Sequence, residues 1–204
     1  MNNPAPDFSL EQAAFARGFH CIAGVDEVGR GPLCGPVTAA AVILNPENIP
    51  EGLNDSKKLT AKRREALYEI LLDVAEVSIA HASVEEIDQL NILRASHLAM
   101  ERAVAGLPCP PDHLLIDGNQ IPQGLTCSAQ AVVKGDAKSV SIAAASIMAK
   151  ICRDRLMVDL AQHYPGYGWE KNAGYPTAAH LKALQQLGVT PHHRRSFKPV
   201  YKML

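Results

Sequence analysis

Residues 21–36 have the sequence Cys-Ile-Ala-Gly-Val-Asp-Glu-Val-Gly-Arg-Gly-Pro-Leu-Cys-Gly-Pro, and the rest of the chain is organised around this stretch. A short apolar run leads into two adjacent acids, Asp26 and Glu27, and then into a glycine-rich turn with one arginine. The apolar run from Ile22 to Val25 predicts a buried strand. Acids at the end of such a strand are unfavourable unless they are paired or bind a cation. We therefore expect a positive group beside them.

The length and composition of the chain fit one large domain, or one domain with a small appendage. Of its 204 residues, 47% are hydrophobic, which is enough for a substantial core. No stretch reaches the ~18 apolar residues of a membrane-spanning helix, and residues 1–15 do not resemble a signal peptide. We expect a cytoplasmic protein that does not associate with membranes. The absence of a heptad repeat favours a monomer.

Five cysteines are present, and no two of them form a Cys-x-x-Cys pair. An odd number of cysteines without such a pair argues against a disulfide framework and against a zinc site. We expect these cysteines to be reduced packing residues.

The net charge of −1 hides an uneven distribution of charge. Residues 1–133 hold 9 Lys and Arg against 17 Asp and Glu, whereas residues 134–204 hold 11 against 4. A basic end of this kind can bind a polyanion such as nucleic acid. A solvated, charge-balanced surface is the alternative that charge alone leaves open.

Hydrophobic periodicity predicts alternating strands and helices. Strands are expected at 22–25, 37–44, 77–82, 113–116 and 129–133. Helices are expected at 9–18, 60–74, 83–106, 139–162 and 177–187, with capping boxes at Ser9 and Ser83. We predict an α/β domain at residues 1–163 and a small helical, basic appendage at 164–204.

Four acids stand at or just after the ends of predicted strands: Asp26, Glu27, Asp117 and Asp136. In α/β sheets, sites are usually assembled at the carboxyl ends of strands. A cluster of oxygen ligands suits Mg²⁺ or Mn²⁺ rather than zinc, and two such ions about 4 Å apart can clamp the oxygens of a displacement at phosphorus. Taken alone, an acid such as Asp117 can instead be a turn or cap residue.

The adjacent acids pose a geometric problem, because consecutive strand residues point to opposite faces of a sheet. Asp26 and Glu27 can serve one site only if the strand bends or ends there, which Gly29 and Gly31 permit.

The turn Gly29-Arg30-Gly31 does not continue into a dinucleotide-binding motif, since Gly35 falls one residue late, and the chain has no P-loop motif. Free backbone N–H groups beside a guanidinium suit close contact with a sugar-phosphate backbone. A tight turn that requires positive φ is the structural alternative.

Further motifs follow along the chain. They are Gly24–Pro32, Asp55–Leu59, Ile116–Gly118, Lys134–Asp136, Ala144–Arg155, Gly174–Thr177 with His180, and His192–Phe197. With these motifs in this order and spacing, the chain resembles the ribonuclease HII family, the bacterial type 2 ribonucleases H, along nearly its whole length.

The resemblance implies a ribonuclease H-like fold, in which helices flank a central mixed β-sheet and a small helical region follows at the C-terminus. It implies an endonuclease that hydrolyses the RNA strand of RNA–DNA hybrids and cleaves at ribonucleotides embedded in duplex DNA, leaving 3′-hydroxyl and 5′-phosphate ends. The family's catalytic, metal-binding acids correspond here to Asp26, Glu27, Asp117 and Asp136, with Mg²⁺ or Mn²⁺ as the cofactor in a two-metal site.

A protein that distinguishes RNA from DNA must contact the 2′-hydroxyl. The resemblance assigns this contact to the backbone of Gly29, Arg30 and Gly31 together with Tyr175, whose ring would lie against the sugar that follows the ribonucleotide. A half-buried aromatic that closes the appendage is the alternative for Tyr175.

Four further positions are predicted to bind substrate: Ser56, Lys57, Lys58 and Ser146. The two lysines can hold phosphates or form a solvated pair before a helix. Ser146 shares a helical face with Lys150, so it either reaches the substrate or lines the sheet.

Four other polar residues are given lesser roles. We expect Arg194 and Arg195 to supply at most charge near the phosphates. His180 and Asp154 are candidates for acid–base chemistry, against the alternative that each is a surface residue or already hydrogen-bonded.

Two other functions fit parts of the sequence. Another metal-dependent nuclease of the same fold class would keep the acids but leave the Gly29–Gly31 turn and Tyr175 unexplained. A non-catalytic nucleic-acid-binding module would explain the basic end but has no use for four acids that repel phosphate.

Overall fold

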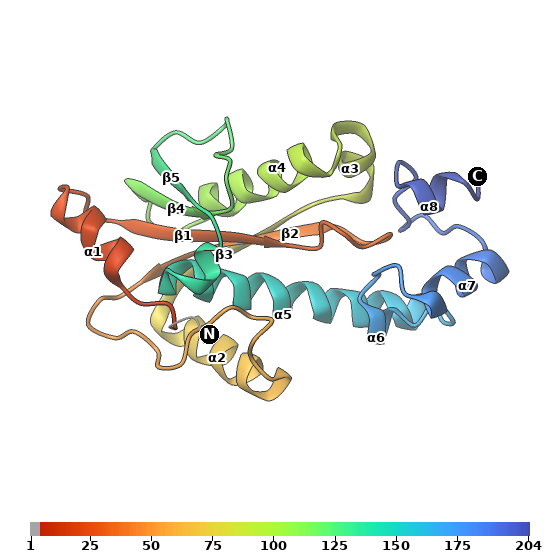
Figure 1. Cartoon of the computed structure of the whole chain (residues 1–204), viewed down its shortest axis with the longest axis horizontal. Coiled ribbons are helices and arrows are strands. Elements are labelled where there is room, and N and C mark those ends of the chain that lie inside the picture. The colour runs from red at the N-terminus through yellow and green to blue at the C-terminus, as the bar shows by residue number, and fades with distance from the viewer. Residues whose placement is uncertain (1–4) are drawn as a thin grey trace.

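A five-stranded mixed sheet lies between two layers of helices in the computed structural model, and short C-terminal helices pack at one end (Figure 1). The structure describes residues 5–204, so the predicted start of the catalytic part at residue 1 lies outside them. The strands are β1 (Ile22–Val28), β2 (Val37–Leu44), β3 (Ala75–Ala82), β4 (His113–Asp117) and β5 (Ser128–Val132). The helices are α1 (Ser9–Ala16), α2 (Ala61–Val74), α3 (Val84–Leu90), α4 (Ile92–Ala105), α5 (Val140–His163), α6 (Trp169–Asn172), α7 (Ala178–Leu187) and α8 (Lys198–Tyr201).

β1 is the central strand of the sheet, whose order is β3-β2-β1-β4-β5. It pairs antiparallel with β2 and parallel with β4, and β5 extends the parallel half. β3 completes the antiparallel half beside β2. The carboxyl ends of β1 and β4 therefore meet at one edge, where sites form in sheets of this kind.

Each face of the sheet has its own core. Val25 and Ala39 belong to a cluster with α4, whereas Ala40 and Val42 belong to one with α2 and α5. α5 lies close against β1 because Gly24 has no side chain: a Cβ there would come 2.1 Å from the Ser141 carbonyl carbon. This contact places the start of α5 directly behind the acidic end of β1.

Two predicted helix boundaries are wrong. Ser9 does not form a capping box, because Phe8 is the N-cap residue of α1 and the Ser9 N–H donates instead to Asp7 Oδ1 at 2.9 Å. The helix predicted at 83–106 is two helices. Asn91 breaks it with a left-handed φ of 70°, and its side chain caps α4 by accepting from the N–H groups of Leu93 and Arg94. The capping box at Ser83 is confirmed.

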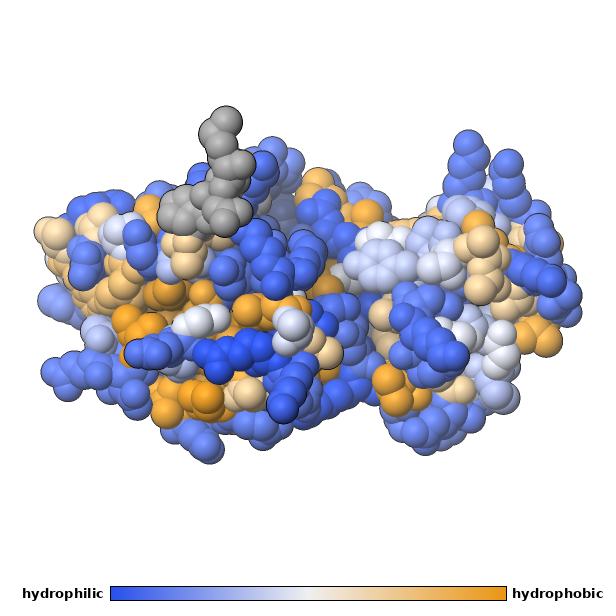
Figure 2. Space-filling view, turned by 60° about the horizontal axis from the view of Figure 1, so that its bottom comes forward, coloured by the Kyte–Doolittle hydropathy of each residue, from blue (hydrophilic) through white to orange (hydrophobic). Residues whose placement is uncertain are grey.

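The C-terminal helices pack on the far half of α5 and on the connection between β1 and β2. Leu33 and Cys34 of that connection are buried in clusters with residues of α6, α7 and α8. Figure 2, a view from the side of α2 and α5, shows that the outline narrows between the main body and these helices. All five cysteines are free. Across residues 5–204, no helix has both the length and the apolar character that crossing a membrane requires.

Candidate metal and nucleic-acid site

The carboxylates of Asp26, Glu27 and Asp117 converge at the ends of β1 and β4. One oxygen of each lies within 4.8 Å of the others. We expected the strand to bend or end at the two adjacent acids, but β1 does not end there. Its regular pairing with β2 continues through both, with Asp26 opposite Ala40 and Glu27 opposite Ala39.

The convergence comes instead from the unequal lengths of the two strands. The pairing of β1 with β4 stops at Val25 opposite Ile116, so Asp26 and Glu27 extend past the last paired residue of β4. They leave β1 on opposite faces, since the partner of Asp26 packs toward α5 and the partner of Glu27 toward α4. Beyond β4 no strand separates the faces, and the two carboxylates can approach each other around the open edge.

Backbone groups hold these acids in place. The Gly135 N–H donates to Asp117 Oδ1 at 2.6 Å, and Lys134 before it has a left-handed φ of 56°. A Cβ at position 135 would come 2.5 Å from Ile142 Cδ1, so a larger residue there would displace the end of the Ile142 side chain. The Glu27 N–H donates to Asp26 Oδ1 at 2.7 Å, and Arg30 Nη1 to Glu27 Oε1 at 3.3 Å.

Asp136 stands slightly apart from the three converging acids, in a short turn that follows β5. Its neighbours include Asp55 and Lys57, which come from the loop before α2. Asp55 was not among the predicted site residues. Its position at the head of the Asp55–Leu59 motif was the available signal.

Burial and neighbouring negative charges make Asp26, Glu27 and Asp136 hard to ionise. Burial raises the pKa of Asp26 well above its usual range, and the charges of Glu27, Asp117 and Asp136 add to the effect. Burial also raises the pKa of Glu27, against the opposing charge of Arg30. It raises that of Asp136 as well. A hard divalent cation would relieve this repulsion, and a set of carboxylate oxygens is the donor set that such a cation prefers.

The Gly29–Gly31 turn lies next to this cluster and faces solvent. Gly29 has a φ of 93°, so the turn does require the positive φ that is natural for glycine. The Arg30 side chain is 47% exposed. The ring of Tyr175 lies over the turn, because a Cβ on Gly31 would be 3.4 Å from Tyr175 Cε1. The structure thus brings together the two elements predicted to sense the ribose.

The loop that carries Lys57 and Lys58 is fixed from beneath by the buried hydroxyl group of Ser146. The Ser56 N–H donates to Ser146 Oγ at 3.2 Å, and that hydroxyl donates to the Ala143 carbonyl at 2.8 Å. Ser56 and Ser146 are therefore placed to position the loop, whereas both lysines are exposed.

The C-terminal part exposes less positive charge than its composition suggests. Arg153 and Arg194 are fully buried on backbone carbonyls, so the prediction that Arg194 supplies charge to phosphates is wrong. Arg155 pairs with Glu65, and Lys150 Nζ lies 2.8 Å from Asp154 Oδ1.

His180 is a buried residue with its hydrogen bonds already made. It accepts from Trp169 Nε1 at 3.0 Å, and this bond makes its Nδ1 the donor to the Tyr175 carbonyl at 2.9 Å. Its burial leaves it no direct contact with a substrate.

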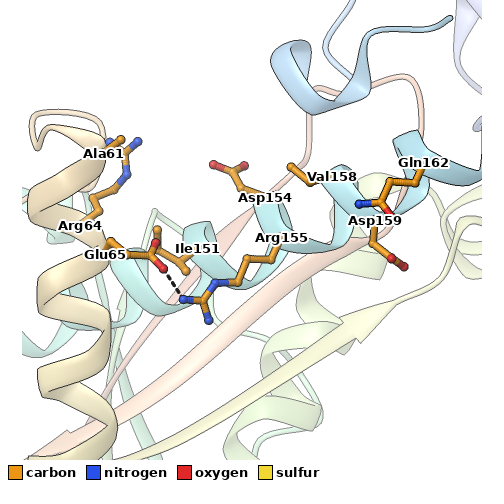
Figure 3. A pocket seen from close by; sticks show the side chains of 9 residues that line it. All are labelled: Ala61, Arg64, Glu65, Ile151, Asp154, Arg155, Val158, Asp159 and Gln162. Carbon is orange, nitrogen blue, oxygen red and sulfur yellow. Dashed lines mark hydrogen bonds and ion pairs between the residues drawn. The ribbon is translucent and has the colours of Figure 1, made fainter. Parts of the chain in front are cut away.

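Of two pockets, one is lined partly by residues of the site and the other by none of them. One of about 230 Å³ joins Glu27 and Asp117 to His97 of α4 and to Asn119, two residues that no sequence motif had marked. The other, of about 410 Å³, lies between α2 and α5 (Figure 3). Its lining residues are Ala61, Arg64, Glu65, Ile151, Asp154, Arg155, Val158, Asp159 and Gln162. Their charges are of both signs, which does not favour a phosphate site there.

Comparisons with known proteins agree with this geometry. The family model described as ribonuclease HII matches residues 23–200. The ribonuclease HII of Ruegeria pomeroyi is 74% identical over 199 residues, which cover 98% of this chain and 85% of that protein. A ribonuclease HII of Cereibacter sphaeroides is 71% identical over 204 residues, which cover 100% of this chain and 96% of that protein.

A solved structure gives the same result for the fold. The crystal structure of the ribonuclease H2 from Pyrococcus horikoshii OT3 matches with a TM-score of 0.77 at 30% identity, covering 90% of this chain and 97% of that chain. The predicted ribonuclease H-like fold, a mixed sheet flanked by helices, is thereby confirmed. The chain belongs to the ribonuclease HII family, whose members are endonucleases that hydrolyse the RNA strand of RNA–DNA hybrids.

Proposed function

We propose that this chain hydrolyses RNA–DNA hybrids, and duplex DNA with embedded ribonucleotides, at a centre formed by Asp26, Glu27, Asp117 and Asp136. The observation that carries the proposal is the convergence of three carboxylates within 4.8 Å, a few residues before a solvent-facing turn. One short stretch of chain thus supplies two of the proposed metal ligands and the turn proposed to contact the ribose.

Mg²⁺ or Mn²⁺ bound by these acids would lower the pKa of the attacking water and stabilise the charge on the leaving 3′-oxygen. Asp26 would be one of the ligands, and the charges of the other three acids all act on its carboxyl group. Asp136 and Asp117 approach it from β5 and β4. Lys57 offsets part of the negative charge and contacts the incoming phosphate together with Lys58.

Ribose selection is the task of Gly29, Arg30, Gly31 and Tyr175. Across residues 5–204, the N–H groups of Arg30 and Gly31 donate to no other group of the chain, which leaves two donors for the 2′-hydroxyl. Tyr175 is 39% exposed, and its ring provides a surface for the neighbouring sugar. Residues 164–204, which begin just after α5 ends at His163, form the substrate-binding appendage.

A cleavage assay on three duplexes tests this proposal. The duplexes carry a single ribonucleotide, a full RNA strand, or DNA only, each with Mg²⁺ or Mn²⁺. We expect cleavage of the first two with 3′-hydroxyl and 5′-phosphate products, and none of the third. Asp117→Asn should slow cleavage by at least about 10³-fold, because one oxygen ligand of the metal-binding centre loses its charge.

Asp73→Asn serves as the control, since it removes an exposed charge from α2 outside the proposed centre and outside the appendage. It should cleave at close to the wild-type rate. Cutting of the DNA-only duplex at a similar rate would contradict the proposal, and so would full activity of the Asp117→Asn variant.

A further inference from the structure

Arg194 is buried at the back of the Gly29–Gly31 turn, although it comes from the other end of the chain. Its side chain is 0% exposed. Nη2 donates to the Gly29 carbonyl at 2.6 Å, Nη1 to the Arg30 carbonyl at 3.0 Å and Nε to the Gly35 carbonyl at 2.9 Å. A buried guanidinium is costly, and these three bonds to carbonyls compensate for the lost solvation.

These bonds determine which way the peptide groups of the turn face. A trans peptide is planar, so the N–H of each residue points opposite to the carbonyl of the residue before it. Because the carbonyls of Gly29 and Arg30 point at Arg194, the N–H groups of Arg30 and Gly31 point away from it. These are the two N–H groups that have no partner among residues 5–204.

The backbone around Arg194 also joins the turn to the loop that carries Tyr175. The Arg194 N–H donates to the Leu33 carbonyl at 2.8 Å, and the Leu33 N–H donates to the Gly174 carbonyl at 2.8 Å. Cys34 is tightly packed there too, since a Cβ on Gly174 would lie 2.8 Å from its Sγ. Arg194 therefore lies where the turn and the tyrosine loop are fastened together.

We propose that Arg194 is a positioning residue for ribose selection, which holds two carbonyls inward so that the N–H groups of Arg30 and Gly31 face the 2′-hydroxyl. This inference rests on the proposed role of the turn. Arg194 touches no substrate atom and acts through the backbone. Lysine cannot replace it, because a single ammonium does not present the planar fork that reaches three separate carbonyls.

The test compares Arg194→Lys with Arg153→Lys. Arg153 is equally buried and its side chain packs against Gly29, but the three carbonyls to which it donates, those of Cys34, Pro36 and Ala173, lie outside the turn. The measured quantity is the ratio of two dissociation constants, for an all-DNA duplex and for the same duplex with one ribonucleotide. EDTA prevents cleavage during the titration.

We expect Arg194→Lys to lower this ratio about tenfold, the equivalent of one hydrogen bond, while affinity for the all-DNA duplex stays within about twofold of wild type. Arg153→Lys should lower the melting temperature to a similar extent but keep the ratio. A folded Arg194→Lys variant with the wild-type ratio overturns the inference. An equal loss of the ratio in both variants also overturns it, because the effect would then be general loosening.

Phe197→Leu provides a second, milder variant in case Arg194→Lys does not fold. The Phe197 ring centroid lies 5.1 Å from Arg194 Cζ, and leucine removes the ring while keeping an apolar side chain. We expect the ratio to fall by about twofold to fivefold. An unchanged ratio in a folded Phe197→Leu variant then counts against the inference. A wild-type ratio of one would instead refute the proposed ribose selection by the turn, whatever Arg194 does.

Discussion

At the scale of single residues, the site combines a functional requirement with a cost in stability. Asp26 is buried among three other acids, and burial together with their charges raises its pKa well above the usual range. A carboxyl with a raised folded-state pKa binds its proton more tightly in the folded than in the unfolded protein. Its contribution to stability is therefore lost as the pH rises through the folded pKa. A bound cation reverses this penalty.

Asp26→Asn should consequently raise the melting temperature in EDTA at pH 8 by several degrees, because asparagine fills the same space without the charge. A gain of 1 kcal/mol corresponds to about 2–4 °C for a domain of this size. Added Mn²⁺ should raise the melting temperature of the wild type more than that of the variant. Asp73→Asn, an exposed site on α2, is the control and should change neither value. A lower melting temperature for Asp26→Asn in EDTA would contradict this account.

At the scale of elements, the site depends on how closely α5 approaches β1. Gly24 allows this approach, and the start of α5 lies just after the turn that carries Asp136. Glu11 of α1 fixes the same end of α5, because its Oε1 accepts from the N–H and the hydroxyl of Ser141 and from the hydroxyl of Ser139. The distance between Asp26 and Asp136 is therefore set by packing between elements.

Gly24→Ala should destabilise the protein by about 1–3 kcal/mol or more, since the new Cβ would meet the α5 backbone. The melting temperature should fall, and the affinity for Mn²⁺ should fall as β1 and α5 move apart. Gly31→Ala is a matched control for stability alone, because its Cβ makes an ordinary contact with the Tyr175 ring. Equal melting temperatures for the two variants would show that the close approach is not needed.

At the scale of the whole molecule, local patterns in the sequence predicted most of the sheet and the acidic centre. Strand ends and motif order sufficed for Asp26, Glu27 and Asp117, because a run of apolar residues that stops at an acid is a local signal. The same periodicity missed the break at Asn91, since apolar spacing continues on both sides of it. Arg194 was misjudged because its burial comes from contacts with residues about 160 positions earlier in the chain.

A second long-range feature is a pair of buried imidazoles, those of His193 and His180. They are hydrogen-bonded to each other, and His180 is bonded in turn to the Tyr175 carbonyl. The Thr190 N–H donates to His193 Nδ1 at 3.0 Å, and His193 Nε2 lies 3.3 Å from His180 Nε2. These bonds require His193 to be neutral with its proton on Nε2. Burial, followed by the charges of His180 and His192, lowers the pKa of His193 to about 4. The packing of the C-terminal helices is thus sensitive to acid.

The free energy of unfolding should therefore fall as the pH drops from neutral toward pH 4, because the unfolded chain binds a proton at His193 near pH 6.5 and the folded chain does not. The contribution of this residue between pH 7 and pH 5 is about 2 kcal/mol.

His193→Asn keeps an acceptor for the Thr190 N–H and cannot be protonated, so it should remove that part of the slope even if its stability at pH 7 is lower. His163→Asn, at the exposed end of α5, should keep the wild-type slope. Urea unfolding at a series of pH values measures how the free energy of unfolding of each variant changes with pH. A wild-type slope in His193→Asn would show that this histidine does not make the C-terminal helices acid-sensitive.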